Sequence, residues 1–160
     1  MKRETLKKAM RDSISEILET MFFMPSEYSE EKDISGVINA PDIAVVSARL
    51  TYTGRLTGTF FVVVPVPLAE ELTGNLLGVN TGVVEQEEIG ATVKELLNMV
   101  AGKTFSLYDS KSVFELGVPE LIEVETVLSG ESDEHRKQVV AVFDTIKNPL
   151  GFKITIDDAS

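Results

Sequence analysis

Two polar side chains, Glu95 and Asn98, stand on an otherwise bare side of a helix predicted over residues 87–106. Successive helical residues are about 100° apart, so apolar residues that recur every three or four positions share one side. Ala91 and Gly102 lie on the side of Glu95 and Asn98, where surface helices normally carry long polar side chains. The small residues would let a large partner approach the helix closely. A carboxylate and a carboxamide at positions i and i+3 are neighbours, so such a partner could contact both. The predicted buried stripe on the opposite side is Ile89, Val93, Leu96, Val100 and Leu107.

The chain lacks the residues of a self-sufficient catalytic centre. It has no cysteine, and its single histidine, His135, follows a predicted acidic turn, where a solvated side chain is the expected role. It also has no glycine-rich phosphate loop of the GxxxxGK[ST] or GxGxxG type. If Glu95 and Asn98 take part in catalysis, a partner must therefore bring the rest of the site.

The composition predicts one domain, over residues 1–160, of ordinary globular type. Hydrophobic residues make up 43% of the chain and charged residues 26%, which is enough to build an apolar core. Lys and Arg number 15 against 26 Asp and Glu, a net charge of −11 that disfavours binding to nucleic acid or to an anionic membrane surface. The sequence contains neither a long apolar run nor a signal-type segment, so the cytoplasmic compartment is the expected location.

The N-terminal part of the chain predicts a helix, a loop and a short strand. The helix covers residues 4–24 and ends before Pro25, because a residue that precedes proline is disfavoured in the α region. Its aromatic end, residues 22–24, is expected to pack in the core. Residues 26–32 are expected to form an acidic loop, and residues 33–39 a short strand. The expected buried stripe of the helix is Leu6, Met10, Ile14, Ile17 and Met21.

The remaining segments predict β-strands and one further short helix. Residues 43–52 and 56–64 form a hairpin signal around the loop Thr53-Gly54-Arg55, and Pro67 opens a short helix that ends by Gly78. The expected fold class is therefore α+β, with an antiparallel sheet packed against two long helices and a short helix. The further strands are expected at residues 113–117, 121–128, 136–145 and 152–156.

The first helix carries a weaker copy of the polar arrangement on the later one. Asp12, Glu16 and Glu19 share the side opposite its apolar stripe, with the spacing of the Ala, Glu and Asn described above. Either the two helices are imperfect copies of one element, or the spacing is a coincidence.

A short motif within the predicted helix resembles that of a known family. The run Glu95-Leu96-Leu97-Asn98-Met99-Val100-Ala101-Gly102 resembles the core motif of the CheC/CheX/FliY chemotaxis phosphatases, and its Asn-Met-hydrophobic-Ala-Gly part is typical of the CheX branch. The family motif has Asp or Ser four residues before the Glu, where this chain has Ala91, and a later Pro, here Pro119. Glu19 stands where a second Asn would complete the copy on the first helix. The order of elements along the whole chain also resembles CheX.

The resemblance implies a phosphatase that acts on a phosphorylated response regulator of the CheY type. Asn98 would enter the regulator's site and orient the hydrolytic water, and Glu95 would pair with the regulator's lysine. Mg²⁺ would be held by the regulator, so no cofactor is expected on this chain. Phosphoryl transfer depends mostly on positioning and charge stabilisation, which two such groups can supply. Two alternatives stay open: a non-catalytic module that binds a regulator, and a module that forms a homodimer through exposed strand edges.

Overall fold

A computed structural model describes residues 3–129 and 136–157, and its centre is one antiparallel sheet of seven strands. The strands lie in the order β1-β6-β7-β3-β2-β4, and β5 also pairs with β2. The prediction for His135 falls outside the described residues. The strands are β1 (Ser26–Ser29), β2 (Val45–Thr53), β3 (Gly58–Pro65), β4 (Glu115–Leu116), β5 (Glu120–Ile122), β6 (Arg136–Thr145) and β7 (Leu150–Asp157).

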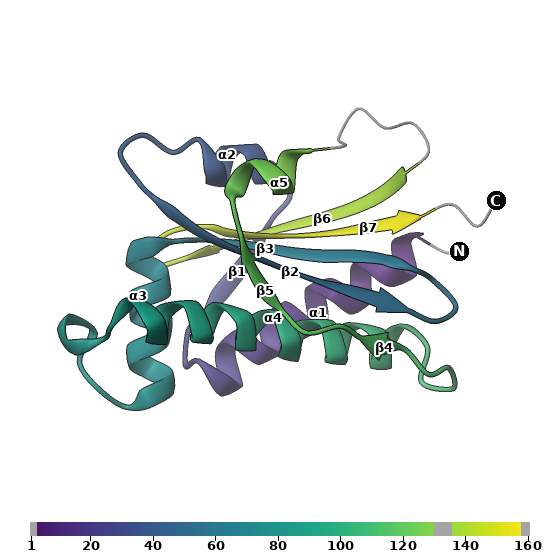
Figure 1. Cartoon of the computed structure of the whole chain (residues 1–160), viewed down its shortest axis with the longest axis horizontal. Coiled ribbons are helices and arrows are strands. Elements are labelled where there is room, and N and C mark those ends of the chain that lie inside the picture. Colours follow the sequence, from purple (N-terminus) through teal and green to yellow (C-terminus); the bar gives the residue numbers. More distant parts are fainter. Residues whose placement is uncertain (1–2, 130–135, 158–160) are drawn as a thin grey trace.

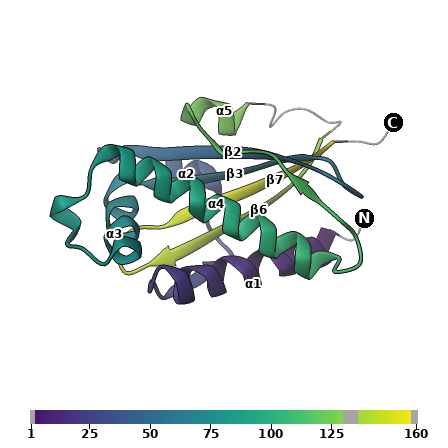
Figure 2. The same cartoon turned by 60° about the horizontal axis from the view of Figure 1, so that its bottom comes forward.

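Helices cover both faces of the sheet (Figure 1). The helices are α1 (Arg3–Met21), α2 (Ile34–Ile38), α3 (Val66–Leu77), the 3-10 turn η1 (Thr81–Val83), α4 (Gln86–Tyr108) and α5 (Val124–Leu128). On one face α1 and α4 lie side by side and run in opposite directions, with α3 near the start of α4 (Figure 2). The short helices α2 and α5 lie on the other face. This arrangement confirms the predicted α+β fold of a sheet packed against two long helices and a short one.

The alternation of side chains along the central strands builds a core on each face of the sheet. Phe60 of β3 is fully buried under the long helices, whereas its neighbour Phe61 belongs to a smaller cluster on the opposite face. Phe60 lies opposite Leu50 of β2 and Ile154 of β7 in the antiparallel register. The larger core therefore holds α4 rigidly against the sheet, because it also contains Leu96 and most of the buried side of that helix.

The first helix ends three residues earlier than predicted. Phe22 and Met24 are buried, but Met21 is 43% exposed and Phe23 is 69% exposed. The prediction of core packing is therefore wrong for Met21 and Phe23. Phe23 adopts a left-handed conformation, with φ of 51°, so the helical spacing does not extend to its ring. Met21 keeps the angle of the stripe but is the last residue of α1, beyond the last buried residues of the helix. Phe22 fills the core at the end of α1, where Met21 was expected.

Two segments before the hairpin also differ from their predictions. The expected acidic loop contains β1, which pairs antiparallel with the end of β6. The expected strand at residues 33–39 is instead helix α2, whose start is fixed by the Asp33 carboxylate as it accepts a hydrogen bond from the Gly36 backbone N–H, 3.0 Å away. Ile34 and Val37, three residues apart, are both buried, which is helical spacing in a segment too short for its period to be clear.

The segment at residues 121–128 is the third departure, because only its start is a strand. β5 ends at Ile122, and α5 begins two residues later. Val124, Val127 and Leu128 have the i, i+3, i+4 spacing of a helix, and Val127 is fully buried in the smaller cluster. The other predicted strands and the short helix that opens at Pro67 are confirmed, with a hairpin loop over residues 54–57 rather than 53–55. No helix of the described chain is long and apolar enough to cross a membrane.

Candidate functional site on helix α4

Helix α4 is fixed at both ends, which sets the rotation of every side chain between them. At its start the Glu85 backbone N–H donates to the Glu88 side chain, at 2.9 Å, and the acidic first turn suits the positive end of the helix dipole. At its end the Asp109 backbone N–H donates to the Phe105 carbonyl, at 3.0 Å. The Asp109 carboxylate then accepts from the backbone N–H of Lys111, and this bond ends the helix in a tight turn.

The two sides of α4 are divided as the sequence predicts, with one exception. Ile89, Val93, Leu96 and Val100 are buried, whereas Leu107 is 51% exposed, so its predicted burial is wrong. Leu107 keeps the angle of the stripe but lies in the last turn, beyond the last buried residues of the helix. On the opposite side Ala91, Glu95 and Gly102 are exposed and Asn98 is half-buried.

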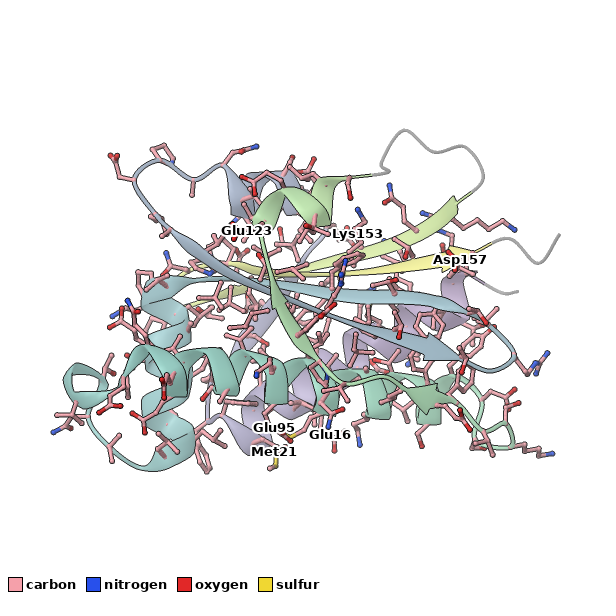
Figure 3. The ribbon with its side chains drawn as sticks, viewed as in Figure 1. Glu16, Met21, Glu95, Glu123, Lys153 and Asp157 are labelled. Atoms are coloured by element: carbon pink, nitrogen blue, oxygen red, sulfur yellow. The ribbon has the colours of Figure 1, made fainter. Side chains whose placement is uncertain are left out.

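Glu95 and Asn98 are left available for a partner outside the chain. Within the described residues, neither the Glu95 carboxylate nor the Asn98 carboxamide has a hydrogen bond or an ion pair. A lysine three or four residues away could pair with Glu95, but α4 has none at those positions. Lys103, two turns further along α4, instead pairs with Glu16 of α1 at 2.7 Å. Figure 3 shows Glu16 and Glu95 on the side of the helical layer that faces away from the sheet.

The polar set on α1 differs from that on α4 because ion pairs within the chain engage it. Asp12 pairs with Lys8 at 2.7 Å, and Glu16 pairs with Lys103. Glu19 is exposed and carries a carboxylate rather than a carboxamide. Of the two sets, only the one on α4 therefore combines a carboxylate and a carboxamide without partners in the described chain. The pairing across the helices could not be predicted from the sequence, because it depends on how α1 and α4 pack together.

A strap formed by β4, β5 and the residues between them runs alongside α4 and brackets Asn98. Before Asn98, the helix packs against the strap at Gly90, where an added Cβ would lie 2.8 Å from Leu121 Cδ1. After it, a Cβ on Gly102 would lie 3.9 Å from Leu116 Cδ1. The strap therefore contacts α4 on both sides of Asn98 along the helix, at Gly90 and near Gly102. No pattern in the sequence indicated this contact of Gly90, which lies on the buried side of the helix.

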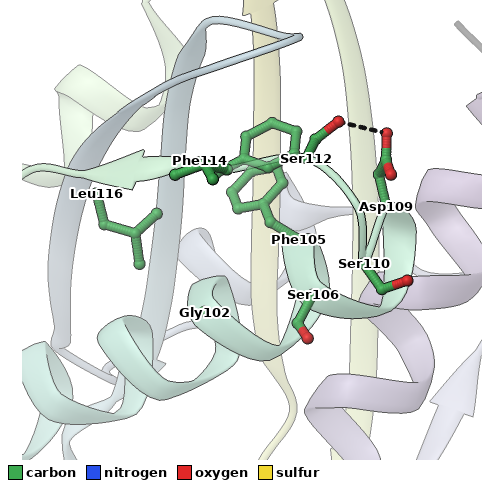
Figure 4. Close-up of a pocket in the computed structure, with 9 residues that line it drawn as sticks. Gly102, Phe105, Ser106, Asp109, Ser110, Ser112, Phe114 and Leu116 are labelled. Atoms are coloured by element: carbon green, nitrogen blue, oxygen red, sulfur yellow. Dashed lines mark hydrogen bonds between the residues drawn. The ribbon is translucent and has the colours of Figure 1, made fainter.

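A cavity of about 320 Å³ opens beside Gly102, one turn after Asn98 (Figure 4). Its apolar wall contains Phe105 and Phe114, whose rings stack with centroids 4.6 Å apart. Its rim carries polar side chains, including Ser106, Ser110 and Asp109. The exposed stripe of α4 thus continues from two polar groups into a hollow with an apolar wall.

The Asp109 carboxylate at this rim is held in its charged form. The Ser112 hydroxyl donates to it at 2.7 Å and the Arg55 guanidinium at 2.6 Å, and these bonds lower the pKa of Asp109 to about 2. The negative charge at the end of α4 therefore persists throughout the neutral and mildly acidic range. Across the parts of the chain that the structure describes, no group of three or more His, Cys, Asp and Glu residues could hold a metal ion.

Comparison with known proteins assigns the chain to a family. The model of the family described as chemotaxis phosphatase CheX matches residues 46–144, which is more than half of the chain and includes Glu95 and Asn98. The chain belongs to the CheX family. No curated protein matches it at a significant level.

Solved structures of CheX and CheC-like proteins share the fold over nearly the whole chain. A CheC-like superfamily protein from Shewanella sp. PV-4 is 21% identical, with a TM-score of 0.72 over 96% of this chain and 98% of that one. A chemotaxis protein CheX from Desulfovibrio desulfuricans is 16% identical, with a TM-score of 0.71 over 95% and 99%. CheX in a CheX–CheY–BeF3–Mg²⁺ complex from Borrelia burgdorferi is 19% identical, with a TM-score of 0.70 over 94% and 97%.

Proposed function

We propose that this chain dephosphorylates a response regulator of the CheY type that carries a phospho-aspartate. The observation that carries the proposal is the pair of Glu95 and Asn98, which project without described partners from a bare helical side. Membership of the CheX family and the likeness to a CheX solved together with CheY and BeF3 support the choice of partner. The chain supplies half of a site, and the regulator supplies the other half.

Asn98 is the proposed positioning group for the hydrolytic water. Its carboxamide can accept one hydrogen bond from the water and donate another to the phosphoryl group. The amide is neutral, so it can approach the anionic phosphoryl group without the repulsion that a carboxylate would meet. The water attacks phosphorus as the bond from phosphorus to the aspartyl oxygen breaks. Inorganic phosphate leaves, the water's proton passes to the phosphate or to solvent, and the aspartate carboxylate is regenerated on the regulator. The gain comes from orientation, because a positioned water reacts without a further loss of entropy.

Glu95 is the proposed docking group. Its exposed carboxylate lies on the same side of α4 as Asn98 and can pair with a lysine of the regulator. This ion pair would fix the angle at which Asn98 enters the regulator's site. Ala91 and Gly102 on the same side leave room for the regulator's backbone. Mg²⁺ bound by the regulator would neutralise charge that develops on the phosphoryl oxygens.

Phosphate release from a phosphorylated CheY-type regulator with Mg²⁺ tests the proposal. We expect this protein to accelerate release, and we expect Glu95→Ala to raise the regulator concentration needed for half-maximal rate while excess regulator restores most of the rate. Glu125→Ala is the matched control, because Glu125 is an exposed helical Glu on the other face of the sheet. No acceleration at high protein concentration would contradict catalysis, and binding without release would favour the non-catalytic module.

A feature of the sheet edge favours a second proposal, a homodimer. β6 extends over residues 136–145, but β1 covers its outer side only from Val142 to Thr145. In the described chain, no strand pairs with the outer side of residues 136–141, and such edges can pair with another copy. Sedimentation over a range of concentrations tests this proposal. A dimer is expected, and a monomer at every concentration would contradict it.

A further inference from the structure

A group of exposed apolar residues, here called the apolar corner, lies between the end of α1 and the start of α4. Phe23 is 69% exposed, Val83 64%, and Met21, Leu77 and Val79 are each close to half exposed. Phe23, Val79 and Val83 line a hollow of about 570 Å³ together with Asn75 and Asn80. Single exposed apolar residues are ordinary, but a contiguous group of them around a hollow marks an interaction surface.

The backbone at Phe23 is strained in a way that the fold does not require of a phenylalanine. Its φ of 51° lies in the left-handed region, which glycine and asparagine adopt more readily than an aromatic residue. The ring gains little burial in return, because Phe22 and Met24 supply the core contacts on either side of it. An exposed aromatic ring on a strained backbone is a feature that folding alone does not explain.

The corner is rigid, so it presents the Phe23 ring in one place. The Met24 backbone N–H donates to the Leu18 carbonyl at 2.9 Å, and the Asn75 side chain donates to the Phe22 carbonyl at 2.9 Å. The far side of the hollow is closed just as tightly, because an added Cβ on Gly74 would lie 2.9 Å from a backbone oxygen. A preorganised surface of this kind loses little conformational entropy when it binds.

The corner is within reach of a partner that sits on Glu95. Val83 precedes α4 by three residues, and Glu95 is nine residues into the helix, about 14 Å along its axis at 1.5 Å per residue. Figure 3 shows Met21 and Glu95 projecting on the same side of the helical layer, away from the sheet. One interface of ordinary size therefore spans both.

We propose that this corner, with Phe23 at its centre, is the apolar anchor on which the response regulator docks, an inference that rests on the function proposed above. The exposed side of α4 offers Ala, Gly, Glu and Asn but no large apolar side chain, whereas stable interfaces depend on buried aromatic or aliphatic anchors. The residues that line the hollow carry no charge, in a chain of net charge −11. An apolar patch of the regulator beside its phosphorylation site can therefore fill the hollow without burying a charged side chain of its lining.

Phe23→Asn tests the anchor, because asparagine tolerates the left-handed backbone and replaces the apolar ring with a small polar carboxamide. We expect the regulator concentration for half-maximal phosphate release to rise about tenfold, which corresponds to about 1.4 kcal/mol, with the maximal rate nearly unchanged. The unfolding temperature should stay the same or increase, since strain is relieved. Ile146→Asn is the matched control, because Ile146 is 95% exposed in the turn between β6 and β7.

The outcomes separate this inference from the proposed function. If the wild-type protein does not accelerate release, both fail together. If it does and Phe23→Asn has the wild-type half-maximal concentration, or if Ile146→Asn is equally impaired, only the anchor is wrong. If Phe23→Asn turns a dimer into a monomer and leaves the regulator concentration for half-maximal release unchanged, the corner binds a second copy of this chain instead.

Discussion

The bare side of α4 makes a prediction that separates stability from function. Gly102→Leu places a side chain on this exposed side, where an added Cβ would have Leu116 Cδ1 as its nearest neighbour, 3.9 Å away. No clash results, and leucine is a better helix former than glycine by about 0.5–1 kcal/mol. For a chain of this size the unfolding temperature should therefore increase by about 1–4 °C.

The same leucine should impair docking if the regulator's backbone approaches α4 closely. Forcing additional methylenes into a close-packed contact costs about 1–3 kcal/mol, which is about fivefold to 150-fold in the half-maximal regulator concentration. The assay pairs thermal unfolding with phosphate release over a series of regulator concentrations. Gly36→Leu is the control, because Gly36 is an exposed helical glycine of α2 on the other face of the sheet, with its nearest neighbour 3.7 Å from an added Cβ. A stabilised Gly102→Leu variant with wild-type kinetics would refute the idea that this side must stay bare.

Three further predictions concern the frame around the site. Gly90→Ala should change the free energy of unfolding in urea by less than about 1 kcal/mol, because the new Cβ meets only the end of the Leu121 side chain, at 2.8 Å, which is 49% exposed and can move aside, and alanine is the better helix former; a loss of about 2 kcal/mol or more would show that the strap is held rigidly against α4. Ser112→Ala should raise the pKa of Asp109 from about 2 toward its ordinary 3.8. A carboxyl with a lowered pKa contributes stability above about pH 4 that is lost as the pH falls toward 2, so the variant's unfolding free energy should depend less on pH in that window, and an identical pH profile would count against the pairing. Tyr52→Phe should cost about 1 kcal/mol, because its buried hydroxyl donates to a backbone carbonyl of β7 at 2.9 Å, and equal denaturation midpoints would argue against that bond.

Long periodic segments could be predicted from the sequence, since each was decided by many residues at once. The buried stripe of α4 and the strands β2, β3, β6 and β7 follow from apolar spacing or β-rich composition alone. The short segments α2 and α5 were predicted as strands, because five residues carry barely more than one helical turn and fit either period. β1 is a strand only because β6 offers it an edge, which is information from the distant end of the chain.

The positions of the candidate site residues on α4 could be predicted from the sequence, but their surroundings could not. Glu95 and Asn98 stood out because their side of the helix is otherwise bare, and both lie on the side where the spacing placed them. The ion pair of Lys103 with Glu16 depends on the packing of α1 against α4, and no local pattern indicates it. The exposure of Phe23 follows from one backbone angle, which the preference of aromatic residues for the core argues against.

The most direct test of the account is the rate of phosphate release by Asn98→Ala at a saturating concentration of phosphorylated regulator. Alanine favours the helix more than asparagine does, so α4 should stay folded, and binding to the beryllofluoride-activated regulator should persist. Loss of a positioning group should lower the maximal rate about 100-fold. A maximal rate equal to that of the wild-type protein would contradict the assignment of Asn98 as the residue that orients the water.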